Sequence, residues 1–145
     1  MAMLTEAGRY HRAASITPWS SPAYQGYQIL HVAFTVAPIV FGLDKFFNFL
    51  TDWSKYLAPG VAHAAEVTPH TFMLVVGVVE IVAGLLVCFW PRVGAYVVTL
   101  WLWGIIGNLL MLHGYYDVAL RDFGLSLGAL ALARMSQSMG REHAA

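Results

Sequence analysis

Two charged residues and one amide stand inside long apolar runs of this sequence, and they are its first candidates for chemistry. Glu80 lies near the middle of one run, Lys45 near the end of another, and Asn108 within a third. A charge near the bilayer centre costs about 2.5–3.5 kcal/mol, so such a residue needs a partner or a function. Helix geometry separates Lys45 and Glu80 by about 9 Å of height, which two long side chains can bridge. We predict a Lys45–Glu80 ion pair with a further hydrogen bond from Asn108.

This polar cluster has three interpretations. The ion pair can be structural and fix the register of two helices. It can form a site for a proton or a quinone head group. Alternatively, Glu80 is protonated and held by hydrogen bonds alone.

Imidazole and indole side chains offer a second candidate site. His70 and His113 lie at the same end of two neighbouring apolar runs, and Trp101 shares a helix face with Asn108. Haem binding in a bundle needs inward histidines at similar depth, and these residues together could hold a quinone, a haem or a chlorin. Interfacial hydrogen bonding and packing are the alternative roles. The sequence has no HExxH motif or Cys/His cluster, so no metal site is predicted.

Other reactive groupings are missing from the sequence. The single cysteine, Cys88, cannot form an internal disulfide. No Ser/His/Asp grouping, phosphate loop or pair of catalytic carboxylates can be assembled. Asp117 and Arg121 are spaced i,i+4, which predicts an interfacial ion pair between them. These observations favour a protein without catalytic activity of its own.

The composition places these residues in a membrane. Hydrophobic residues make up 59% of the 145 residues and charged residues 11%, against about 45–50% and about 25% in soluble domains. Eight basic residues balance eight acidic ones. Without a basic excess nothing favours nucleic-acid binding, whereas a lipid bilayer is the expected surrounding.

The apolar runs predict an all-α membrane protein, a four-transmembrane-helix antiparallel bundle. The expected helices cover approximately residues 27–50, 70–90, 93–112 and 118–134. Residues 1–26 are expected to form an N-terminal cytoplasmic arm, 27–134 the membrane domain and 135–145 a C-terminal tail. A short interfacial segment is expected near residues 53–57, because aromatic side chains favour the headgroup level.

The distribution of Lys and Arg predicts the orientation. The side with both termini carries five of these residues and the other side three; the five are Arg9, Arg12, Arg92, Arg134 and Arg141. Both termini are therefore expected in the cytoplasm, with the chain in a bacterial inner membrane.

Three segments resemble the DoxX-like family of small four-helix membrane proteins. They are FGLDKFF (Phe41–Phe47), GVVEIVAGLLV (Gly77–Val87) and ALRDFGLSLGALALAR (Ala119–Arg134), and the resemblance covers about residues 28–134. It implies that Lys45 and Glu80 match the family's characteristic charged pair. Some members are small subunits of membrane oxidoreductase assemblies, including a thiosulfate:quinone oxidoreductase. The resemblance carries over no catalytic residue.

Three functions follow as hypotheses. The first is an accessory or structural transmembrane subunit of a larger membrane electron-transfer complex, respiratory or photosynthetic, with other membrane subunits as partners. The second is a DoxX-like oxidoreductase subunit that contributes a quinone or haem site. The third is a small transporter or proton-conducting bundle, in which Glu80 carries the proton.

Overall fold

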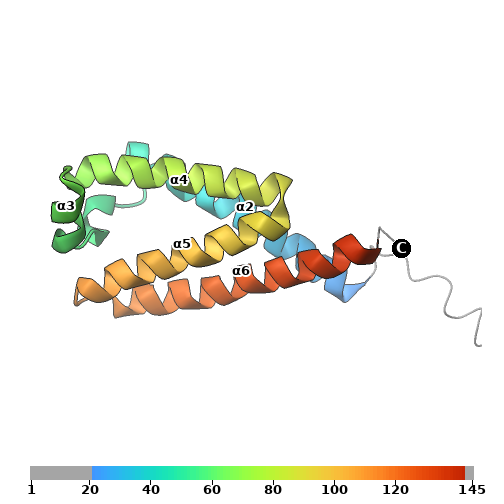
Figure 1. The fold of residues 1–145 in the computed structure, drawn as a ribbon. Coiled ribbons are helices and arrows are strands. Elements are labelled where there is room, and N and C mark those ends of the chain that lie inside the picture. Colours follow the sequence, from blue (N-terminus) through green and yellow to red (C-terminus); the bar gives the residue numbers. More distant parts are fainter. Residues whose placement is uncertain (1–20, 143–145) are drawn as a thin grey trace, which may run out of the picture.

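The computed structural model describes residues 21–142, which fold into helices joined by two short turns and one longer connection (Figure 1). The elements are α2 (Pro22–Phe47), η2 (Trp53–Tyr56), α3 (Pro59–Ala65), α4 (Pro69–Phe89), α5 (Pro91–Met111) and α6 (Tyr116–Glu142). Among the described residues α2, α4 and α5 are long and apolar enough to span a membrane. The expected all-α class is confirmed for the described residues, and the three apolar helices are consistent with a membrane protein. α6 is not one of the three, and Arg121, Asp122 and Arg134 interrupt its apolar stretch.

The helix boundaries agree with the apolar runs in the middle of the chain and differ at its ends. α4 and α5 begin and end within two residues of the predicted limits. α2 starts earlier, because Pro22 is pre-organised for a first helical position. α2 ends three residues early, because Asn48 adopts the left-handed conformation with φ 53°. The expected arm therefore shortens, and its first 20 residues lie outside the described residues.

The predicted C-terminal tail is wrong for residues 135–142, which continue α6. This part of α6 packs against the start of α2. A Cβ placed on Gly26 would lie 3.6 Å from the methyl group of Met135. The tail composition indicates a polar segment, but packing against α2 keeps it helical.

Close packing joins α2 to α4 along most of its length, and glycines make it possible. A Cβ on Gly42 would lie 2.6 Å from the carbonyl oxygen of Gly77, and one on Gly84 would lie 2.8 Å from that of Thr35. Small residues let the two backbones approach in this way. The α2/α4 pair is therefore fixed in register.

The α5/α6 pair meets the α2/α4 pair chiefly at the end that carries the α4–α5 turn. The largest core cluster lies there and takes buried residues from all four helices: Phe34, Ala83, Val87, Ala95, Val98, Ala129, Leu132 and Ala133. A Cβ on Gly94 would collide with the backbone of Val87. Farther along α5, a Cβ on Gly104 would meet nothing within 4 Å. Figure 1 shows α4 and α5 diverging from their turn toward the opposite end.

The connection between α2 and α4 lies at that opposite end. It contains η2, close to the predicted interfacial segment, and α3, which was not predicted. A second core cluster forms there from Ile106 and Leu109 of α5 and Ala119 of α6, and Tyr56 of η2 packs on it. This contact joins the connection to the α5/α6 pair.

Candidate functional site

Lys45 and Glu80 meet inside the α2/α4 pair. Lys45 Nζ lies 2.6 Å from Glu80 Oε2, and the two side chains are 4% and 11% exposed. Lys45 stands in the last turn of α2, and its side chain leans back toward the helix start, where Nζ also donates to the carbonyl of Phe41 at 3.5 Å. Because a long side chain on a helix leans in this direction, Lys45 covers the difference in height to Glu80.

Trp53 of η2 covers the lysine. Lys45 Nζ lies 3.8 Å from the centroid of the Trp53 ring, which is cation–π geometry. The indole Nε1 of Trp53 donates to Asp44 Oδ2 at 2.7 Å, so the ring is held in place over the ammonium. Lys45 thus has a carboxylate, a carbonyl and an aromatic face around it.

Asp44 completes the end of α2, a role that the sequence did not indicate. Its carboxylate accepts the backbone N–H groups of Phe49 and Leu50 at 3.0 and 3.2 Å, besides the Trp53 indole. α2 ends five residues after Gly42, whereas α4 begins eight residues before the facing Gly77. The end of α2 therefore lies about 4.5 Å inside the length of α4. Amides at that depth need protein acceptors, which Asp44 supplies.

The predicted hydrogen bond from Asn108 to the ion pair is wrong. Asn108 Oδ1 accepts the amide of Ala58 at 2.9 Å, and its Nδ2 donates to the carbonyl of Tyr56. Both partners belong to the connection, which folds over the end of α5. Asn108 therefore joins the connection to α5 and does not take part in the charged cluster.

The two histidines proposed as cofactor ligands do not converge on a site. His70 is exposed at the second residue of α4. His113 is exposed in the turn after α5 with φ 45°, and its Nδ1 lies 3.0 Å from the carbonyl of Met111. α4 and α5 have diverged at this end, so neither imidazole faces the interior. The geometry gives no support to haem ligation by this pair.

Trp101 is half-buried and lies beside Glu80, and its side chain is within hydrogen-bonding reach of the Glu80 carboxylate. The indole Nε1 itself is buried, but its geometry toward the carboxylate falls short of a well-formed hydrogen bond in the part of the chain that the structure describes. The Glu80 carboxylate is therefore the acceptor available to this donor.

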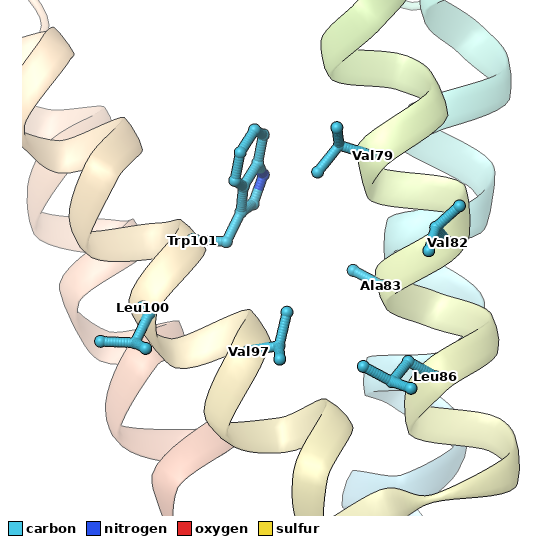
Figure 2. A pocket seen from close by; sticks show the side chains of 7 residues that line it. All are labelled: Val79, Val82, Ala83, Leu86, Val97, Leu100 and Trp101. Atoms are coloured by element: carbon cyan, nitrogen blue, oxygen red, sulfur yellow. The ribbon is translucent and has the colours of Figure 1, made fainter.

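A cavity of about 350 Å³ separates α4 from α5 beside this indole. It is lined by Val79, Val82, Ala83, Leu86, Val97, Leu100 and Trp101 (Figure 2). Figure 2 shows the indole of Trp101 reaching from α5 toward α4, opposite Val79. Apart from the indole N–H, the lining side chains are aliphatic.

The charged residues at the start of α6 are arranged differently from the prediction. Asp117 and Arg121 are both exposed, and they form no ion pair among the described residues. Exposed pairs gain little from closing, which explains why the i,i+4 spacing is not used. Asp122 is instead half-buried and close enough to Glu80 for the two carboxylates to repel each other.

The described residues contain no group of three or more His, Cys, Asp and Glu side chains that could hold a metal ion. Comparison with known proteins gives no match, whether with family models, curated protein sequences or solved structures. The interior polar groups of this chain and the shape around them are therefore the observations from which its function is argued.

Proposed function

We propose that this chain is an accessory transmembrane subunit of a larger membrane electron-transfer complex. The observation that carries the proposal is a two-helix projection. It consists of the first two turns of α2 and the last two turns of α6, which extend past the α4–α5 turn (Figure 1). His31 Nε2 lies 3.0 Å from the carbonyl of Val87, so His31 of α2 and Val87 of α4 stand at the same height along the bundle. From that level α2 continues nine residues to Pro22, whereas α4 continues only two to Phe89. α2 therefore extends about 10 Å farther.

The surface of the projection suits a protein partner. Gln25 and Ser138 are exposed on it. Gln28 Nε2 donates to the Tyr24 hydroxyl within α2 at 2.6 Å, and Gln137 Nε2 joins α6 to α5 by donating to the Tyr96 hydroxyl at 2.8 Å. A rigid polar surface beyond the apolar spans can dock a neighbouring subunit with little ordering cost.

The membrane arrangement in this proposal has four spans. α6 is the fourth, with Arg121 and Asp122 near one headgroup region and Arg134 near the other. The excess of Arg on the side of the α4–α5 turn favours a cytoplasmic position for the projection and both termini. A bacterial inner membrane fits this distribution.

The resemblance of residues 41–47, 77–87 and 119–134 to the DoxX-like family directs the proposal toward electron-transfer complexes. Within the α2/α4 pair, the 2.6 Å contact between Lys45 and Glu80 supports a structural use of these charges. Each is already neutralised by the other, which suits a subunit that stabilises an assembly.

Purification from native membranes in a mild detergent tests this function. The unchanged chain should elute with stoichiometric redox subunits, identified by mass spectrometry. Ser138→Trp, on the projection, should release them, whereas Leu120→Trp should not, because Leu120 is 71% exposed on α6 away from the projection. Elution of the unchanged chain alone, or equal retention by both variants, would overturn the proposal.

A further inference from the structure

α6 has an apolar outer face that no other helix of the described chain covers. On its inner side Ala129 is fully buried in the core cluster shared with α2, α4 and α5. On its outer side Leu120 and Leu127 are 71% and 51% exposed, and Gly124 and Ala131 are exposed as well. Figure 1 shows α6 at the edge of the bundle beside α5. Residues 120, 124, 127 and 131 are called the α6 stripe below.

The α6 stripe has the shape that a second helix can pack against. Its residues are spaced by four, three and four positions, so they lie on one side of the helix, and large and small side chains alternate along it. A Cβ on Gly124 would meet nothing within 4 Å, which leaves room for another backbone to come close. Leu120 and Leu127 can then pack on either side of the approach point.

Two unpaired charges stand beside this stripe at the start of α6. Asp117 and Arg121 are exposed, and neither forms an ion pair in the part of the chain that the structure describes. Asp117 lies seven residues before Gly124, and therefore on the same side of the helix. The side chain of Arg121 leans toward the helix start, which brings its guanidinium to the level of Asp117. One face of α6 thus presents an acid and a base at nearly the same depth.

This charge arrangement identifies a second copy of the chain as the occupant. Two copies insert with the same orientation, because the same distribution of Lys and Arg directs both. A two-fold axis along the membrane normal then sets equal residues at equal depth, with Arg121 of each copy beside Asp117 of the other. We propose that the protein forms a parallel dimer in which the α6 stripes of two copies pack together and these charges pair across the axis. Charge pairs of this kind fix register and partner choice, while the apolar stripe supplies the contact area.

The dimer requires α6 to be the fourth span of the proposed membrane arrangement, but it makes no use of the projection beyond the α4–α5 turn. Release of redox subunits and loss of the dimer are therefore separate results, and either proposal can fail alone.

Disulfide cross-linking of the full chain in proteoliposomes at low protein density tests the contact. Cys88 is exposed and is first replaced by Cys88→Ala, so that it cannot cross-link. In this background Gly124→Cys should form a linked dimer on mild oxidation, because a contact at Gly124 brings the two Cα atoms within disulfide range. Leu125→Cys is the matched control, since Leu125 is 49% exposed on the same helix and points about 100° away. It should cross-link at least about ten times more slowly. Equal rates, or no linked dimer from Gly124→Cys, would overturn the inference.

Charge variants then test whether the partner is a second copy. With Gly124→Cys, Asp117→Arg gives a chain with two basic residues on this face and Arg121→Asp a chain with two acidic ones. Each alone should cross-link about ten times more slowly, because like charges now meet across the axis. An equal mixture of the two should recover the original rate, since every pair is opposite again. Far-UV circular dichroism checks that both variants keep their helices. No recovery in the mixture, or cross-linking of Gly124→Cys in native membranes to a different polypeptide in place of a second copy, would overturn the proposal.

Discussion

Removing one partner of the Lys45–Glu80 pair leaves the other as an unmatched charge inside the bundle. The side chains are only 4% and 11% exposed, so water cannot replace the missing partner. Breaking a buried pair from one side costs about 3–5 kcal/mol, whereas replacing both members with apolar residues is often neutral or stabilising. We expect Glu80→Ala and Lys45→Ala each to lower the free energy of unfolding by about 3–5 kcal/mol. The double variant Lys45→Met, Glu80→Met should recover most of this loss.

The two single variants should differ in a defined direction. In Glu80→Ala the remaining lysine keeps the face of Trp53 at 3.8 Å and the carbonyl of Phe41 at 3.5 Å. In Lys45→Ala the remaining carboxylate loses its hydrogen-bonded cation, and the cation–π contact is lost as well. That contact contributes about 0.5–2 kcal/mol. Lys45→Ala should therefore be the more destabilising by about 1 kcal/mol.

Equilibrium unfolding in mixed micelles, followed by far-UV circular dichroism, measures these differences. Lys55→Ala and Asp117→Ala are the matched controls, because both residues are exposed. They should change the free energy by less than about 1 kcal/mol. If the double variant loses as much as the two single variants together, the charges do not act as a pair and this reasoning is refuted.

Three further perturbations test the surrounding architecture. Gly42→Ala should push α2 away from α4 and lower the free energy of unfolding by more than about 1 kcal/mol. Gly104→Ala should be neutral or stabilise by up to about 1 kcal/mol, since nothing lies within 4 Å of a Cβ at that position. Equal effects of the two variants would contradict the close packing of α2 on α4. Asn108→Ala should cost about 1–3 kcal/mol and speed amide hydrogen exchange in residues 56–58, and unchanged exchange would show that the connection is held otherwise. Asp44→Ala should expose the Trp53 indole and speed exchange in residues 49–50, whereas exchange like that of the unchanged chain would rule out its capping role.

The sequence predicts the membrane helices and the ion pair for the same reason. Apolar runs of membrane length have one dominant solution in lipid, since every backbone group must bond within its own helix. Pro91 begins α5, which explains why its limits could be placed closely. Once the helices are set, Lys45 and Glu80 are the charges that must find partners in the interior.

Contacts that depend on the connection could not be predicted. Asn108 was expected to bond to the charged pair because it is a polar side chain inside an apolar run. In the structure Trp101 borders the space between α4 and α5, whereas Asn108 bonds to the connection and Ala95 and Val98 pack on the core. No local pattern indicates that Tyr56 and Ala58 reach Asn108 from about 50 residues away. The exposed positions of the histidines follow from the same divergence.

Lys45 of α2 and Glu80 of α4 contact each other, so this ion pair does not depend on the position of α5 and α6. The α5/α6 pair is joined to the α2/α4 pair by the apolar cluster around Val87 and Ala95 and by the Asn108 contact at the far end. A small change in the separation of α4 and α5 would therefore alter the cavity at Trp101 and leave the 2.6 Å contact between Lys45 and Glu80 unbroken. The charges fix the register of α2 against α4, and the space beside them is bordered mainly by apolar side chains, so it can change in width without exposing a charge to lipid.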